Sequence, residues 1–238
     1  MGRIIFVIAA ALLLAGCGTA NQITAVGPMV SQHIEGTGIR ALDIDGLFDV
    51  TWQQSDGYYI RIEAQQNLLD ILEWAVTDAG TLAVRFSGNV TVANRAYTPR
   101  VYVGSPYLAA AHFTGAVSAS GWDTVRAHGF SMSVSGASSA YIDLEIEALT
   151  VDADGAGRLV FTGSSTIASI TAAGAVSVLA DSLQVKDAVV YATDAASVSI
   201  AASDHLDVQV SSAAFVRYAG DPEVRSNISG AGSLSRIE

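Results

Sequence analysis

The amino-acid sequence predicts an all-β fold: a parallel β-helix-like solenoid with rungs of about 20 residues and one short helix near the N-terminus. Three observations support this prediction. From about residue 108 the chain consists mainly of alanine, serine, glycine and valine. A corner of two small residues recurs there at intervals of 18 to 21 residues. Short runs typical of β-strands flank each corner. The corners are Gly115-Ala116, Gly136-Ala137, Gly155-Ala156, Gly174-Ala175, Asp194-Ala195, Ser212-Ala213 and Gly230-Ala231.

The regular interval between corners decides among the repeat architectures. Helical repeats use longer units with helix-forming faces, which this part of the sequence lacks. Small residues are expected where successive backbones stack closely, and we expect corner residues such as Ala175 to face inward, so that Ala175→Phe would overpack the core. A β-sandwich with strands every eight to twelve residues or so is the alternative, but it does not produce one interval near 20.

The N-terminus has the pattern of a bacterial lipoprotein signal. Arg3 precedes an apolar run over residues 4–13, which is too short to span a membrane. The run ends in Leu14-Ala15-Gly16-Cys17, and Cys17 is the only cysteine of the chain. We therefore predict a signal peptide over residues 1–16 and lipidation of Cys17 after cleavage.

Residues 17–33 are predicted to be the lipidated N-terminus and a tether, because the segment lacks clear hydrophobic periodicity. Gly18 follows the lipidated cysteine, where enteric bacteria use aspartate to retain lipoproteins in the inner membrane. Gly18 therefore favours the outer membrane.

Between residues 34 and 107 the sequence predicts strands around a single helix. Apolar residues alternate with polar ones on both sides of Asp45-Gly46, a turn signal, and again around residues 58–62, 82–86 and 100–103. The helix is expected over residues 66–76, with Asn67 as its N-cap. We expect this helix to cap the N-terminal end of the solenoid with Leu68, Leu69, Ile71 and Leu72.

The charge balance excludes two classes of partner. The chain has 12 basic and 23 acidic residues, and losing Arg3 with the signal peptide leaves a net charge of about −12. Nucleic-acid binding requires clustered lysine and arginine. Electrostatic docking on anionic lipid head groups requires them too. The acyl chains on Cys17 would therefore provide the membrane attachment.

Several segments resemble the head GIN domain family of bacterial envelope proteins, which are described as putative auto-transporter adhesins. The resemblance spans roughly residues 34–238, which we take as one head-GIN-like β-solenoid domain. It implies a right-handed parallel β-helix-like fold and an envelope location, and it brings no catalytic or binding residues. The segments are residues 46–50, 59–64, 67–69, 76–84 with Gly80-Thr81-Leu82, 113–116 and 134–139; Asp194 and Ser212 depart from the family's corner glycine.

Acidic residues are the candidates for a cation site or for catalysis. Asp152 and Asp154 flank Ala153, so in a strand both side chains point to the same side, and Asp143, Asp181 and Asp194 lie on nearby coils. Stacked carboxylates can hold Ca²⁺. However, no nonapeptide calcium repeat is present, and aspartate favours turns for its backbone hydrogen bonds alone. We therefore predict no metal, no cofactor and no catalytic residue, with Asp152 and Asp154 as the residues to test.

Other chemistry-bearing residues favour structural roles. The four histidines are widely separated, and only His112 and His128 could approach across neighbouring coils, so surface histidines are the favoured interpretation. The aromatic residues gather in the N-terminal half, where packing against the solenoid end is favoured over stacking on sugar rings. The residues are His33, His112, His128 and His205, and Trp52, Trp74, Trp122, Tyr58, Tyr59, Tyr97, Tyr102 and Tyr107.

These observations favour a non-enzymatic, lipid-anchored envelope protein whose solenoid surface contacts a glycan, another envelope protein or a cell. The alternative is a carbohydrate-active β-helix enzyme with an acidic cleft, which requires two carboxylates within about 5–10 Å of each other. A structural or stress-related surface protein is a third possibility. The sequence leaves the ligand, the side of the outer membrane and the oligomeric state undetermined.

Overall fold

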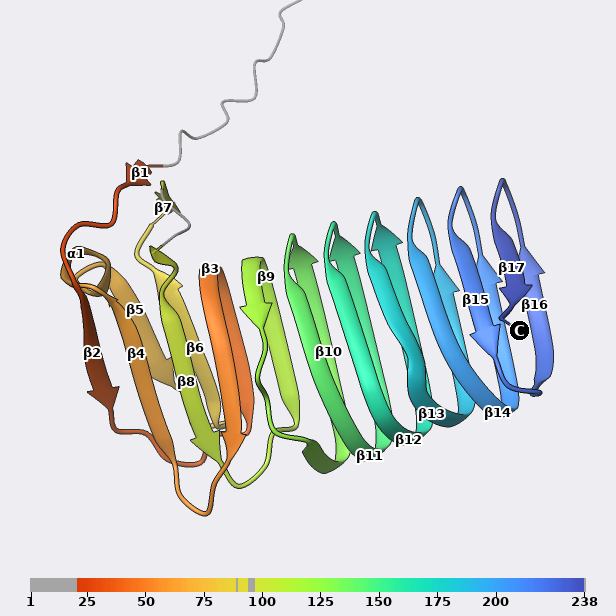
Figure 1. Ribbon diagram of the computed structural model, residues 1–238, viewed down its shortest axis with the longest axis horizontal. Helices are drawn as coiled ribbons and strands as arrows, with labels where there is room; N and C mark the ends of the chain where they lie inside the picture. Colours follow the sequence, from red (N-terminus) through yellow and green to blue (C-terminus); the bar gives the residue numbers. More distant parts are fainter. Residues whose placement is uncertain (1–20, 89, 94–96, 238) are drawn as a thin grey trace, which may run out of the picture.

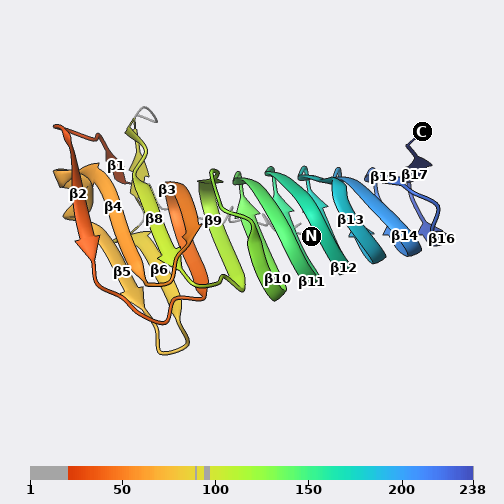
Figure 2. The same cartoon turned by 60° about the horizontal axis from the view of Figure 1, so that its bottom comes forward.

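Alternating apolar and polar residues from Ala110 onward form strands that pair in parallel with the strand of the next coil, which confirms the predicted solenoid. The computed structural model describes residues 21–88, 90–93 and 97–237. Figures 1 and 2 show the coils stacked along the long axis, with β2 and β17 toward opposite ends. The strands of the repeat are β9 (Ala110–Ala119), β10 (Val125–Gly136), β11 (Ser139–Gly155), β12 (Arg158–Gly174), β13 (Ser177–Ala192), β14 (Ser197–Val210), β15 (Phe215–Ala219), β16 (Glu223–Ile228) and β17 (Ser233–Arg236).

Each long strand bends midway and contributes to two sheets. In β11, residues 139–146 lie before the bend and residues 148–155 after it, and the two segments pair with the corresponding halves of β12. The last coils show the division directly, because β14 pairs with β15 through its first half and with β16 through its second. We call the part of each coil before the bend the first sheet and the part after it the second sheet.

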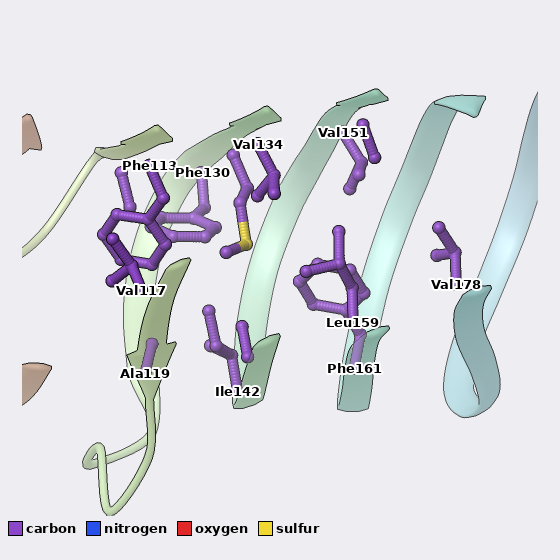
Figure 3. Close-up of a cluster of buried hydrophobic side chains, with 14 of the residues drawn as sticks. Phe113, Val117, Ala119, Phe130, Val134, Ile142, Val151, Leu159, Phe161 and Val178 are labelled. Carbon is purple, nitrogen blue, oxygen red and sulfur yellow. The ribbon is translucent and has the colours of Figure 1, made fainter. Parts of the chain in front are cut away.

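The core lies between the two sheets. Inward residues alternate along both halves of a coil, as at Ile142 and Leu144 in the first sheet and Val151 and Ala153 in the second, all nearly inaccessible to solvent. Figure 3 shows Ile142 pointing into this interior from one sheet and Val134 and Val151 pointing into it from the opposite sheet. The apolar half of the strand alternation is thus buried, which leaves the polar half facing outward along every coil.

The corners are in register, as the repeat predicts. Gly115, Gly136, Gly155 and Gly174 are paired partners on successive coils, and all four have positive φ angles, between 75° and 120°. The amide of each corner alanine donates to the carbonyl of the preceding corner, as from Ala175 to Gly155 at 2.7 Å. Asp194 and Ser212 adopt the same left-handed backbone, with φ of 60° and 59°, so the two departures from glycine preserve the coil geometry.

The expectation that the corner alanine Ala175 faces inward is wrong. Ala175 is exposed, as are Ala137 and Ala156 at the equivalent positions. The steric restriction lies at the preceding glycine, because a Cβ atom on Gly174 would lie 2.6 Å from the carbonyl oxygen of Gly155. Overpacking by Ala175→Phe is therefore no longer expected.

The N-terminal part extends the two sheets with both parallel and antiparallel pairs of strands. β3 passes through a further corner at Gly46, which pairs with Gly115, and joins the solenoid to the antiparallel pairs β4–β8, β2–β4 and β5–β6. A further short pair joins β1 and β7 in parallel. The elements are β1 (Asn21–Ile23), β2 (Met29–Ile34), β3 (Ala41–Gln54), β4 (Tyr59–Gln65), α1 (Gln66–Leu69), β5 (Leu72–Val76), β6 (Thr81–Phe86), β7 (Val90–Val92) and β8 (Arg100–Ser105).

Two expectations about this part need correction. The helix predicted over residues 66–76 ends at Leu69, and Leu72–Val76 is strand β5. The apolar residues of Leu72–Val76 fit the two-residue period of a strand as well as they fit the apolar stripe of a helix. Pairing with β6 stabilises the strand. Leu68 is fully buried, and Leu69, Ile71 and Leu72 pack against the core, so these four side chains do cover this end.

Part of the segment predicted as a tether, residues 17–33, forms strands: β1 at Asn21–Ile23 and most of β2. Met29–Ile34 forms β2, which pairs antiparallel with β4, and Ile34 is buried. Backbone pairing to an available sheet edge requires no strong side-chain periodicity, which is why the pattern did not reveal this strand. The predicted lipidation site Cys17 and the predicted signal peptide over residues 1–16 lie outside the described residues.

The aromatic residues divide between core and surface. Trp52 is fully buried and packs near Trp122, with ring centroids 6.3 Å apart, while Phe48 stacks on Phe86 at 5.0 Å. Other aromatic residues of the N-terminal half remain partly exposed, and so do two tyrosines and a phenylalanine farther along the solenoid. The exposed residues are Tyr58, Trp74, Tyr97, Tyr107, Tyr141, Tyr191 and Phe215.

Candidate functional site

The outward side of the second sheet carries an unbroken line of polar side chains, one from each coil. Because the strands are parallel and in register, the residue three positions before each corner is paired with its counterpart on the next coil. We call this line the polar row. It consists of Asp43, His112, Ser133, Asp152, Thr171, Tyr191, Gln209 and Asn227.

Two parallel lines of mostly small or polar side chains flank the polar row. Beside the corners lie Asp45, Thr114, Ser135 and Asp154, and toward the bend lie Ala110, Ser131, Thr150, Ser169, Val189, Asp207 and Arg225. Together the three lines form what we call the second-sheet face. Neighbouring coils lie about 4.8 Å apart. The face therefore repeats hydroxyl, carboxylate and amide groups at that spacing.

The second-sheet face is hollowed on both sides of Tyr191. One hollow of about 250 Å³ is lined by Thr171, Tyr191, Gln209 and Asn227, together with the hydroxyl-bearing residues Thr193, Ser211 and Ser229. A second, of about 380 Å³, lies toward the bend and includes Tyr191, Gln209, Asp207 and Arg225. Both are shallow and open. Tyr191 lines both hollows, and the residue is 42% exposed.

Asp152 and Asp154 lie as predicted, on the same side of one strand, with the buried Ala153 between them. Both are exposed. The structure does not bring the other predicted carboxylates to them: Asp143 is on the first sheet, Asp181 is exposed in the part of β13 where the register with β14 shifts, and Asp194 is at a corner. Among residues 21–88, 90–93 and 97–237, no three His, Cys, Asp or Glu side chains converge on a possible metal position.

Asp143 has a structural role. It accepts hydrogen bonds from the hydroxyls of Thr124 and Thr162, on the preceding and following coils, each at 2.7 Å. These bonds to the ionised carboxylate lower the pKa of Asp143. The side chain therefore links three successive coils.

The histidines do not form a shared site. His112 lies in the polar row, whereas His128 lies near the bend, 3.1 Å from Glu147. His205 is also near the bend, where its Nδ1 lies 2.6 Å from a carboxylate oxygen of Asp187. The hydrogen bond to Asp187 raises the pKa of His205, and the charges of Asp187, Glu223 and Asp204 add to the increase.

The raised pKa of His205 predicts a pH-dependent contribution to stability. Because the folded state favours the protonated ring, the contribution is present below the unfolded pKa of 6.5 and is lost as the pH rises through the folded pKa. We expect His205→Asn to lower the free energy of unfolding in weak acid, with the difference closing above neutral pH. Urea unfolding at several pH values checks this. Once Asp187→Asn is present, His205→Asn should have little further effect; a pH-independent effect of His205→Asn would contradict the assignment.

The fold and its face can be compared with known proteins. A sequence profile described as "Putative auto-transporter adhesin, head GIN domain" matches residues 39–222. The chain belongs to this family. No curated protein matches it, and within the described part of the chain no helix has the length and apolar character needed to cross a membrane.

Three crystal structures of similar shape come from species of Bacteroides and Parabacteroides. A putative adhesin from Bacteroides fragilis is 19% identical, covers 90% of this chain and 100% of its own, and superposes with a TM-score of 0.81. A putative adhesin from Parabacteroides distasonis is 21% identical over 91% of this chain and 100% of its own, with a TM-score of 0.70. A putative lipid binding protein from the same species is 18% identical over 92% and 100%, with a TM-score of 0.72. At these identities the likeness establishes the head GIN fold alone.

Sequence reasoning missed the C-terminal half of the polar row in this head GIN domain. Tyr191, Gln209 and Asn227 each stand three residues before the corners at Asp194, Ser212 and Gly230. The corner repeat and the two-residue period of a strand together place these side chains on one outward line. That signal is present in the sequence, although a search for metal-ligand or catalytic spacing does not detect it.

Proposed function

We propose that this chain is a non-enzymatic, lipid-anchored protein of the bacterial outer membrane that serves adhesion, with the second-sheet face as its contact surface. The observation that carries the proposal is the polar row, which presents polar side chains, most of them exposed, at one regular spacing. A stiff solenoid offers such a face without requiring a pocket. The family's description as adhesins supports the same function and an envelope or surface location.

The geometry of the acidic residues disfavours the enzymatic alternative. Glycoside cleavage requires one carboxyl group with a raised pKa beside a second carboxylate in a site that excludes water. Asp152 and Asp154 are both exposed on an open sheet, which does not exclude water from them.

Binding without turnover tests the proposed function. The full chain, solubilised in detergent, is applied to a glycan array and to intact bacterial and host cells, and the same glycans are assayed for reducing-sugar release. Retention on a glycan or cell surface without product formation is expected. Absence of retention on every surface would overturn adhesion, and product formation that Asp154→Asn abolishes would establish the enzymatic alternative.

Removing the lipidation site tests the anchor. We expect Cys17→Ala to abolish acyl modification and to release the protein from the membrane fraction, because no acyl chains then partition into the bilayer. Cell fractionation with immunoblotting measures the distribution, and Ser55→Ala at a surface turn is a matched control. An unchanged membrane-bound proportion would contradict the lipoprotein interpretation. Protease treatment of intact cells determines on which side of the outer membrane the domain lies.

A further inference from the structure

The neighbourhood of Tyr191 differs from the rest of the second-sheet face because it combines an aromatic ring with free amide groups. Gln209 and Asn227 follow Tyr191 in the polar row, and all three side chains are exposed. Within the described part of the chain, none of these three side chains takes part in a hydrogen bond. Their amide and hydroxyl groups are therefore available to a ligand lying along the row.

The surroundings of Tyr191 have the chemistry that recognises sugars. A sugar ring has an apolar C–H face that stacks on an exposed tyrosine ring and hydroxyl edges that exchange hydrogen bonds with amides. Thr171 on one side of Tyr191 and Gln209 on the other place such partners at both edges of the ring. The core of a protein–protein interface would instead need clustered apolar side chains. The polar row offers one large ring among hydroxyls, amides and carboxylates.

The spacing of the row favours an extended chain over a compact ligand. Successive coils lie about 4.8 Å apart, which is close to the length of one sugar unit in an extended β-linked polymer. The hollow of about 250 Å³ continues past Gln209 to Asn227 and Ser229, so a chain stacked on Tyr191 meets further polar groups at each coil. A coiled α-linked polymer would not follow a straight row.

The charge of the face excludes acidic glycans. Asp152, Asp154 and Asp207 are exposed on it and form no ion pair within the described residues. Arg225, the arginine in the three lines that define this face, is already engaged with Glu223 at 3.1 Å. A uronate or sulfated polymer would therefore meet uncompensated negative charge.

We propose that the segment of the polar row from Thr171 to Asn227 binds an extended, uncharged, β-linked polysaccharide, with Tyr191 as the stacking platform and Gln209 and Asn227 as hydrogen-bonding partners. This inference rests on the proposed adhesive function and names its ligand class.

Affinity electrophoresis of the detergent-solubilised full chain tests the proposal. The probes are hydroxyethylcellulose and mixed-linkage β-glucan as uncharged β-linked polymers, amylose as a coiled polymer, and polygalacturonate as an acidic one. The variants are Tyr191→Ala, Tyr191→Phe and the double variant Gln209→Ala/Asn227→Ala. Tyr141→Ala is the matched control, because Tyr141 is an exposed tyrosine on the opposite sheet.

Retardation by at least one uncharged β-linked polymer, and by neither amylose nor polygalacturonate, is the expected result. Tyr191→Ala and the double variant should each weaken binding by about tenfold or more. Tyr191→Phe should retain most of the affinity, and Tyr141→Ala should not change it. Circular dichroism confirms that each variant is folded.

The outcomes separate this inference from the proposed function. Binding of the uncharged polymers that is insensitive to Tyr191→Ala overturns the assigned site, and equal or stronger binding of polygalacturonate overturns the ligand class. Absence of binding to either uncharged β-linked polymer, with retention on cells preserved, overturns the inference and leaves adhesion in place. Loss of both polymer binding and retention on cells contradicts adhesion itself.

Discussion

Replacing Gly155 by alanine is expected to destabilise the protein by about 3 kcal/mol or more. Gly155 sits at a corner with a φ of 120°, which L-residues rarely adopt. A Cβ atom there would lie 2.3 Å from the carbonyl oxygen of Gly136. That oxygen is held in place, because it accepts the hydrogen bond from Ala156 at 2.8 Å. Relief therefore requires two stacked corners to move apart. Urea unfolding followed by circular dichroism measures the change.

Gly121→Ala is the matched control for the backbone effect. Gly121 also has positive φ, 67°, but a Cβ atom there would have no neighbour within 4 Å. This variant should show only the conformational cost of a left-handed residue, about 1 kcal/mol. If Gly155→Ala and Gly121→Ala had equal effects, the close approach of the corners would not be what requires glycine at residue 155.

Phe161→Ala is expected to destabilise the protein by roughly 3–5 kcal/mol, because it removes a fully buried aromatic ring and leaves a cavity. Phe161 is completely inaccessible and lies on the inward side of β12, paired with Ile142 of the preceding coil. The core is filled by inward side chains from two hydrogen-bonded sheets, and because these sheets are held by their backbone pairing, few neighbours can collapse into the space. The loss should appear as a lower urea midpoint with an unchanged slope.

The control for Phe161→Ala is Tyr141→Ala on the neighbouring strand β11. Tyr141 is also aromatic, but it points outward and is 56% exposed. Its replacement should change stability by less than about 1 kcal/mol. A small effect of Phe161→Ala would show that the coil interior relaxes around cavities more readily than a close-packed core does.

The repeating part of this fold could be predicted from the sequence because its cause is local and recurs. Positive φ at Gly115, Gly136 and Gly155 requires small residues, and the strand period fixes what lies between them. The N-terminal part is different. Leu72–Val76 fits both a helical and a strand pattern, and pairing with β6, which begins only after the next turn, determines the outcome.

On the candidate surface too, features with a local cause could be predicted, whereas features that depend on pairing between strands could not. The same-side placement of Asp152 and Asp154 followed from their spacing alone. The alignment of Tyr191 with Thr171 and Gln209 depends on register between coils, which one strand does not specify. The corners determine this register. Two of the corners are harder to recognise in the sequence, because Asp194 and Ser212 adopt the positive φ there in place of glycine.

Along each coil, buried residues alternate with outward-facing residues, and this separation has an evolutionary consequence. Because each coil pairs only with its two neighbours, copying one coil inserts a rung without disturbing either end of the molecule. Each duplication would lengthen the outward row by one residue and about 4.8 Å. Mutations on that row can then diversify while the inward residues keep the coils stacked. A lineage of such proteins can thus change the reach and the chemistry of its surface independently of its fold.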